Sequence, residues 1–293
     1  MIRLLTQQDY DIVQSYLDKD PLNNVYLIHG LQTYGLESKR VTFWGAFNND
    51  RLEGVLLVDY GRGRTGFLAG DNPEILAQLG KCALEANINW LFGKSEYIRP
   101  AVAAIENSYP QIEVQQAPAH HFFEIHPGQA VGHYDHPVRI ATRDDVPLLM
   151  ELYQNDESSQ THLERQIREA IDRSACFFIE VEGRAVSAVR VDLETDQAGM
   201  IKAAKTLPEF RGRGMYLSLR TACFEYLFKQ GKVALGTIDD DNIAMHRIAE
   251  KYGGSFTAPW SYIHFKKSPS LRQRILRRLR RWGLRIRDKI LRQ

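Results

Sequence analysis

The sequence predicts a mixed α/β protein built from two similar blocks. The apolar pattern of the second block gives the order β-α-α-β-β-β-α-β-α-β, and helices that alternate with strands in this way suit a mixed sheet covered by helices. The first block begins alike, with a Thr- and Asp-rich cap, an amphipathic helix and a hairpin, which hints at a duplicated fold. The chain of 293 residues is long enough for two domains of ordinary size.

The first block extends to about residue 126. Thr6 can cap a helix whose apolar positions are Ile12, Val13 and Leu17, and the turn-forming run Asn48-Asn49-Asp50 separates two β-rich stretches. We expect a helix over 6–20, a hairpin over 41–60, helices over 72–86 and 97–110, and a closing strand over 119–126.

A linker is expected over residues 127–136, which are rich in Gly, Pro and His and show little periodicity. Five histidines fall in or near this stretch, but their spacing fits no common metal-ligand pattern and no carboxylate motif accompanies them. A polar linker is therefore favoured over a metal site, and we predict no metal. The five are His120, His121, His126, His133 and His136.

The second block covers residues 137–267. Its hairpin turns at Glu182-Gly183, and its longest helix follows an Arg- and Gly-rich turn. We expect a strand over 137–142, helices over 143–156 and 158–173, a hairpin over 175–194, a strand over 198–206, a helix starting over 211–216, a strand over 232–238, a helix over 241–253 and a final strand over 257–265.

Composition limits the class of protein. Apolar residues make up 44% of the chain and charged residues 25%, which is typical of soluble globular proteins. Three widely spaced cysteines suggest neither a disulfide framework nor a zinc site, so we expect a reducing, cytoplasmic compartment. No apolar run of signal-peptide length opens the chain, and no run of about 18 apolar residues could span a membrane.

The stretch "LPEFRGRGMY", residues 207–216, predicts an anion site. The first N–H groups of a helix lack internal partners and carry partial positive charge. Gly212 and Gly214 leave the backbone open to a ligand, and Arg211 and Arg213 add charge. Together these features favour phosphate or pyrophosphate. The stretch is neither a Walker loop nor a Gly-x-Gly-x-x-Gly motif, and an exposed basic turn is the alternative interpretation.

The same stretch resembles the acetyl-CoA-binding motif of the GCN5-related N-acetyltransferase (GNAT) family, Arg/Gln-x-x-Gly-x-Gly/Ala. Arg211 and Gly214 match, whereas Tyr216 stands where the family has Gly or Ala. The segment 239–254 resembles a later helix of the family, with five positions in place: Asn242, Met245, Glu250, Lys251 and Gly253. The resemblance covers 137–267, and the first block resembles a degenerate acetyltransferase-like domain.

The resemblance implies a GNAT fold for the second block, preceded by a second GNAT-like domain. It also implies acetyl-CoA as co-substrate and direct attack on its thioester by an amine of a small molecule or peptide. The backbone of 211–216 would hold the pyrophosphate, and groups near Ala204 and Thr206 the pantetheine arm, where the preceding strand splays from its neighbour. The implied CoA-binding residues are Ala204, Thr206, Arg211, Gly212, Arg213, Gly214, Met215, Tyr216 and Asn242.

The catalytic groups are harder to assign. Many members of the family use a tyrosine on the last helix as the acid, and Ala249 occupies the matching position. His246 and Tyr252 lie three residues either side of it and are the candidate substitutes, although packing roles are favoured for both. No general base is assigned, and Asn242 could instead serve as a helix cap. A non-catalytic acyl-CoA-binding or interaction module therefore remains the alternative function.

The tail, residues 268–293, carries ten Lys or Arg and one acid, whereas the rest of the chain is mildly acidic. Six apolar residues fall within an arc of about 100°, the width of an apolar helical stripe. The tail is thus predicted to be a basic amphipathic helix that docks on the body of the protein, binds the inner face of an anionic membrane or, less favoured, grips nucleic acid. The six are Leu271, Ile275, Leu279, Trp282, Ile286 and Ile290.

Overall fold

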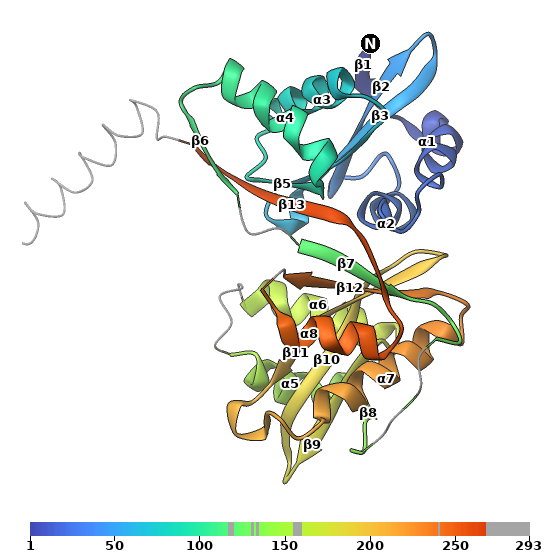
Figure 1. The fold of residues 1–293 in the computed structure, drawn as a ribbon, viewed down its shortest axis with the longest axis vertical. Helices are drawn as coiled ribbons and strands as arrows, with labels where there is room; N and C mark the ends of the chain where they lie inside the picture. The colour runs from blue at the N-terminus through green and yellow to red at the C-terminus, as the bar shows by residue number, and fades with distance from the viewer. Residues whose placement is uncertain (117–119, 130–131, 133–134, 155–159, 240, 268–293) are drawn as a thin grey trace, which may run out of the picture.

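The computed structural model describes residues 1–116, 120–129, 132, 135–154, 160–239 and 241–267. Two halves of similar build lie one above the other (Figure 1). We call residues 1–116 the first half and residues 135–254 the second half. The remaining described strands, β7 (His120–Ile125) and β13 (Ser255–Lys267), lie where the halves meet. The predicted tail helix, 268–293, lies outside the described residues.

The first half contains six of the strands and four of the α-helices that the structure describes. In chain order its elements are β1 (Ile2–Leu4), α1 (Tyr10–Leu17), α2 (Val25–Tyr34), β2 (Val41–Asn48), β3 (Arg51–Asp59), β4 (Thr65–Gly70), α3 (Pro73–Glu85), β5 (Trp90–Lys94), α4 (Ser95–Ser108) and β6 (Ile112–Gln116). The last strand, β6, pairs with β13. Short 3-10 turns precede α1 (Gln7–Asp9) and β4 (Tyr60–Arg62).

The second half repeats this order. Its elements are β8 (Arg139–Ile140), α5 (Val146–Leu152), α6 (Gln160–Asp172), β9 (Cys176–Val181), β10 (Arg184–Glu194), β11 (Ala198–Thr206), α7 (Met215–Phe228), β12 (Val233–Asp239) and α8 (Ile243–Lys251). Short 3-10 turns precede α5 (Arg143–Asp145) and α7 (Pro208–Phe210). The predicted duplication is therefore visible element by element.

Matching side chains support the duplication. Asp9 completes a capping box with Thr6 at the start of the first half, and Asp145 does the same with Thr142 at the start of the second. Each aspartate also pairs with an arginine of the preceding strand, at 2.6 Å and 2.9 Å. In both halves the pair fixes the entrance to the first helix. The arginines are Arg3 and Arg139.

The halves exchange their closing strands. Through the described residues one sheet runs in the order β1-β2-β3-β4-β5-β13-β7-β12-β11-β10-β9-β8, with β6 pairing β13. The strand β13 crosses from the second half to pair β5 and β6 of the first, while β7 leaves the first half to pair β12 of the second (Figure 1). The expected closing strand 119–126 thus closes the sheet of the other half.

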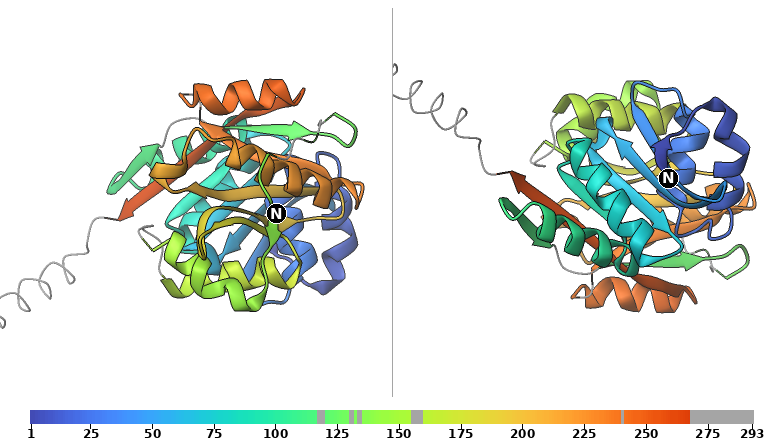
Figure 2. Two further views of the ribbon diagram at one scale, coloured as in Figure 1. Left: turned by 90° about the horizontal axis from the view of Figure 1, so that it is seen from below. Right: turned by 90° about the horizontal axis from the view of Figure 1, so that it is seen from above.

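Helices cover both faces of the sheet in each half (Figure 2). In the first half α1 and α2 pack on one face and α3 and α4 on the other; in the second, α7 lies on one face and α5 and α6 on the other. One core cluster contains residues of both halves. Phe122 of β7 and Trp260 of β13 belong to it, and their rings stack with centroids 4.2 Å apart. The interface is therefore part of the hydrophobic core.

The sequence-based expectations hold for most elements. Both expected hairpins form, and their turn residues take positive φ, as at Asn49 (45°) and Gly183 (78°). Sequence reasoning missed β1, α2, β4, β5 and β6. It also placed the start of α7 too early: the helix begins at Met215, because Gly212 and Gly214 adopt φ of 74° and 84° and keep the preceding turn out of the helix.

Candidate functional site

The parallel strands β11 and β12 separate halfway along their length. They pair from Ala198 opposite Val233 to Ile201 opposite Gly236. Beyond this point β11 continues to Thr206 and β12 to Asp239 without pairing each other. The backbone of β11 from residue 202 onward is consequently open on the side that faces β12, as the resemblance implied for the strand that holds the pantetheine arm.

A β-bulge distorts β11 at this opening. Val189 of β10 lies opposite two residues, Ala203 and Ala204, and Ala203 has φ of 54°. The buried Tyr153 donates its hydroxyl hydrogen to the carbonyl of Ala203 and so fixes the bulge from the side of α5. Ala204 is exposed, and the Thr206 hydroxyl is held 2.7 Å from that of Ser187. Bulges re-aim the backbone next to binding sites.

The turn that follows presents a row of free N–H groups. Within the described part of the chain, no acceptor binds the N–H groups of Gly212, Arg213, Gly214, Met215 or Tyr216. The left-handed Gly214 caps α7 with its backbone, and no side chain takes over the capping role. Successive free N–H groups in such a turn at a helix start form a concave site for an anion.

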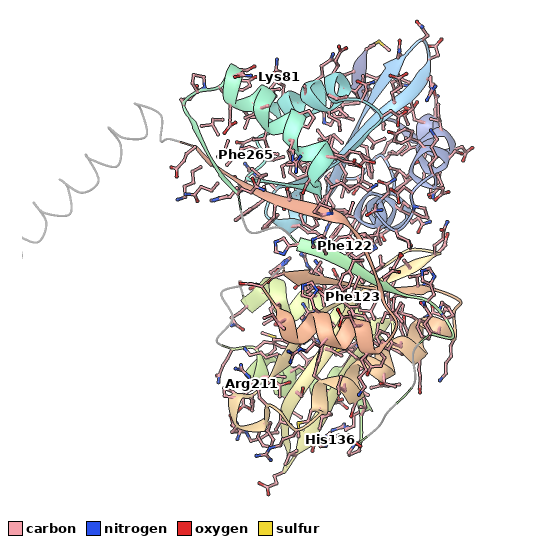
Figure 3. The ribbon with its side chains drawn as sticks, viewed as in Figure 1. Lys81, Phe122, Phe123, His136, Arg211 and Phe265 are labelled. Carbon is pink, nitrogen blue, oxygen red and sulfur yellow. The ribbon has the colours of Figure 1, made fainter. Side chains whose placement is uncertain are left out.

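The two arginines of the turn lie on its surface. Arg211 Nε donates to the carbonyl oxygen of Thr206 at 3.2 Å, and Arg213 donates to that of Glu209 at 2.9 Å. Figure 3 shows Arg211 in the second half, away from the junction of the halves. Both side chains are exposed. They therefore add positive charge beside the free N–H groups without filling the turn.

Tyr216, the departure from the family pattern, is directed along α7. Its hydroxyl accepts a hydrogen bond from Arg220 at 3.1 Å. Arg220 is fully buried, and its guanidinium lies 4.3 Å from the ring centre of Phe123. Burial raises the pKa of the Tyr216 hydroxyl, and the neighbouring cation opposes that rise. The tyrosine is thus anchored one turn further along the helix instead of lying across the row of free N–H groups.

The candidates on α8 occupy different environments. Asn242 precedes α8, and its carbonyl accepts from His246 N, which is the position of a helix cap. His246 is half-buried with its ring 5.3 Å from Phe256. Tyr252 is 4% exposed and packs edge-to-face on Phe224. These contacts agree with packing roles, and neither His246 nor Tyr252 lines the cavity described next.

A cavity of about 340 Å³ lies between the halves at the opening of β11 and β12. The second half contributes Lys202 of β11 and Thr237 and Asp239 of β12. All three lie beyond the point where β11 and β12 stop pairing with each other. The remaining lining residues come from the first half and the exchanged strands: Tyr26, Arg62, Thr65, Phe67, Phe92, His120 and Tyr262. Its size is within the usual range of small-molecule sites.

His120 and Asp239 form the polar pair of this cavity. They are opposite residues on the paired strands β7 and β12, and the carboxylate holds Nδ1 of the imidazole by a short hydrogen bond. Sequence reasoning missed His120 as a functional residue, since its partner is 119 positions away and lies in the other half. The run of histidines was the available signal, but only the strand exchange shows which of them meets a carboxylate.

Two further properties concern the described residues as a set. No group of three or more His, Cys, Asp or Glu in them is arranged to hold a metal ion. None of their helices is long and apolar enough to cross a bilayer.

Comparison with known proteins assigns the second half to a family. Residues 146–254 match the model of the acetyltransferase (GNAT) family. This range includes the bulge, the turn before α7 and the whole of α8, so the elements that form the opening are among those on which the family model matches. No curated protein matches the sequence significantly.

Solved structures with the same fold match nearly the whole chain. A GNAT-family acetyltransferase from Colwellia psychrerythraea superposes with a TM-score of 0.59 at 13% identity over 92% of this chain and 100% of its own. A GCN5-related N-acetyltransferase from Sphaerobacter thermophilus superposes with a TM-score of 0.62 at 12% identity, over 91% of this chain and 95% of its own. A tandem GNAT protein from the clavulanic acid biosynthesis pathway superposes with a TM-score of 0.57 at 13% identity, over 92% of this chain and 99% of its own. Both halves therefore share the GNAT fold.

Proposed function

We propose that the chain transfers the acetyl group of acetyl-CoA to an amine. Residues 146–254 form an acetyltransferase domain of the GNAT family, which makes the chain an acyltransferase. The observation that carries this proposal is the row of free N–H groups at 212–216, next to the opening between β11 and β12. A pyrophosphate fits such a row, because each free N–H can donate to a phosphate oxygen and the helix dipole favours the negative charge.

The remaining contacts to acetyl-CoA follow from this anchor. The backbone of Ala204 and Thr206, on the open side of β11, is suited to bind the amides of the pantetheine arm and to polarise the acetyl carbonyl. Arg211 and Arg213 supply charge to the phosphates from the surface of the turn. We expect Asn242, at the start of α8, to contact the pantetheine arm.

We assign separate tasks to the two parts of the chain predicted as domains. Residues 137–267 bind acetyl-CoA through the turn before α7 and the opening of β11 and β12. Residues 1–126 provide a wall of the acceptor cavity through Tyr26, Phe67 and Phe92. An acceptor in that cavity lies beside Lys202, where β11 and β12 part, and so faces the expected position of the thioester.

Calorimetric titration with CoA and acetyl-CoA, followed by assays of CoA release with a panel of amines, tests this function. We expect binding in the micromolar range and release of free CoA that depends on an added amine. Binding without turnover over a broad panel would favour the alternative, a non-catalytic acyl-CoA-binding module. Absence of binding would contradict both.

The tail and the compartment belong to the same proposal. Three free cysteines among the described residues agree with a reducing, cytoplasmic environment. We expect the apolar face of 268–293 to be covered either by the body of the protein or by anionic lipid. Co-sedimentation of the full chain and of residues 1–267 with anionic and neutral vesicles at two salt concentrations distinguishes them. Salt-sensitive binding of the full chain alone to anionic vesicles would identify the membrane.

A further inference from the structure

We propose that the cavity between the halves binds an aromatic or other large apolar amino acid, and that His120, oriented by Asp239, takes the proton from its amine. This inference rests on the proposed acetyltransferase function and names the acceptor class for the same site. Three properties of the cavity support it: the aromatic side chains in its wall, its charge and its one oriented histidine.

The walls of the cavity are aromatic. Tyr26 and Phe67 stack at 4.6 Å, and Phe92 meets Tyr26 edge-on at 5.3 Å and Tyr262 at 5.5 Å. Tyr26, Phe67 and Phe92 are less than a tenth exposed, so other side chains hold these rings in place. A ring or branched aliphatic group on the acceptor would gain both apolar burial and ring-on-ring contact there.

The charge of the cavity favours an anionic group on the acceptor. Among the described residues that line it, Asp239 is the only acid, and it is already paired with His120. Lys202 donates to the Tyr26 hydroxyl, and no described carboxylate lies within ion-pair distance of its ammonium. Arg62 Nε lies 3.3 Å from a carboxylate oxygen of Asp59, and Arg40 Nε lies 3.6 Å from the other oxygen. Two cations thus share one carboxylate, and the group of three has a net positive charge.

This balance selects among amines. A polyamine or an aminoglycoside, which carries several positive charges, would meet two cations and no free carboxylate. An amino acid brings a carboxylate that can pair with Lys202, within reach of Arg62. The nearby cations also lower the pKa of the substrate ammonium, since they disfavour its charged form. The same residues thus recognise the carboxylate and assist loss of a proton from the ammonium group, which gives the neutral amine.

The pair of His120 and Asp239 supplies the proton acceptor. Asp239 accepts the Nδ1–H hydrogen bond, so the tautomer is set and Nε2 keeps its lone pair. No described residue binds Nε2. The substrate ammonium first releases one proton to solvent. As the neutral amine nitrogen attacks the acetyl carbonyl carbon, a second proton passes from it to Nε2; the C–N bond forms, the C–S bond breaks, and CoA leaves as a thiolate that takes up a proton from solvent. The products are the N-acetyl amino acid and CoA.

The cations are tested by binding, with and without CoA, so that the result does not depend on turnover. The probes are phenylalanine, tyrosine, tryptophan and leucine, each beside the amine that lacks only the carboxylate, for example phenethylamine. We expect at least one amino acid to bind tenfold or more tightly than its amine. In Lys202→Met this ratio should fall below threefold, whereas Lys81→Met, an exposed lysine on α3 far from the cavity (Figure 3), should retain it.

Equal or tighter binding of the amine, binding of none of the four amino acids, or an unchanged ratio in Lys202→Met would overturn the proposal. Failure of the proposed function gives a different pattern. If acetyl-CoA does not bind while the amino acid does, the acetyltransferase assignment fails and the cavity assignment stands. If acetyl-CoA binds and no amino acid does, the cavity assignment alone fails.

The proton acceptor is tested with His120→Asn, in which the side-chain amide can still donate to Asp239 but no basic nitrogen remains. We expect kcat for the bound amino acid to fall at least 100-fold while KM for acetyl-CoA changes less than twofold. The matched control is His121→Asn, the neighbouring histidine that faces Thr257 instead of the cavity. Full activity of His120→Asn, or an equal loss in His121→Asn, would remove His120 from this role.

Discussion

At the scale of single residues, the site depends on backbone conformations that few side chains permit. Gly212 and Gly214 hold positive φ, and between them they turn the chain so that successive N–H groups face outward. Their importance could be predicted from the sequence, because two closely spaced glycines beside a predicted helix indicate that the backbone turns there or admits a ligand. The positive φ of Ala203 could not, since alanine gives no sign of a bulge.

Gly214→Glu should abolish acetyl-CoA binding. The added carboxylate would occupy the anion site and repel the pyrophosphate, which we expect to weaken binding at least 100-fold, or by about 2.7 kcal/mol. The control for the cost of positive φ is Gly183→Glu, at a hairpin turn with φ of 78° and open space around it. Both variants should lose about 1–2 kcal/mol of stability, but Gly183→Glu should bind normally in a calorimetric titration. A folded Gly214→Glu with unchanged affinity would contradict the assignment.

His29 predicts how stability depends on pH. It lies between the halves, with Nδ1 2.9 Å from the carbonyl oxygen of Glu194, and burial lowers its pKa to about 4. The unfolded chain takes up this proton near pH 6.5 and the folded chain only near pH 4. The free energy of unfolding should therefore fall as pH drops from 6.5 to 4, by at most about 1.4 kcal/mol per pH unit for this group.

Denaturant titrations of the wild type and of His29→Gln at several pH values between 7 and 4 measure this effect. The variant should be less stable at pH 7 and should lose less stability on acidification. A slope in the variant as steep as in the wild type would show that other groups are responsible. Asp9 and Asp145, whose pKa values are lowered in the folded state, contribute below this range, because their stabilisation is lost only as pH falls through their titration.

At the scale of elements, hydrophobic periodicity predicts type better than partner. The expected ranges for β11 and for both hairpins agree with the structure, because apolar, β-rich runs bounded by turn-forming residues are a local property of the sequence. The partners of β7 and β13 depend on contacts between distant parts of the chain. No feature in the sequence of either strand indicates which half it pairs with. The contact between His120 and Asp239 therefore could not be predicted from the sequence.

Trp260→Ala should destabilise both halves at once. Trp260 is 1% exposed on β13 and packs against Phe92 at 4.8 Å and Phe122 at 4.2 Å, one residue from the first half and one from the exchanged strand β7. We expect a loss of about 3–5 kcal/mol and a fall in Tm of roughly 10 °C. The control Phe256→Ala removes a ring that is 39% exposed on the same strand and should cost far less. Equal effects of the two variants would argue against β13 as the strand that joins the cores.

At the scale of the whole molecule, the two halves share a fold and differ in their use of it. The stretch "GRGRTG", residues 61–66 of the first half, resembles the turn before α7 in sequence, but an aspartate binds its first two N–H groups. Asp59 accepts from Gly61 N at 2.8 Å and from Arg62 N at 3.2 Å, and the strand β4 follows instead of a helix. We therefore expect the first half to bind no CoA and to serve the acceptor side.

The measurement that tests the account most directly is the stoichiometry of acetyl-CoA binding in the full chain, compared between two matched glycine variants. Gly63 and Gly214 both have positive φ and lie in the two stretches of similar sequence, but Gly63 lies between β3 and β4 whereas Gly214 directly precedes α7. We predict one acetyl-CoA per chain, retained in Gly63→Glu and lost in folded Gly214→Glu. Two molecules per chain, none, or loss in Gly63→Glu with retention in Gly214→Glu would contradict the account.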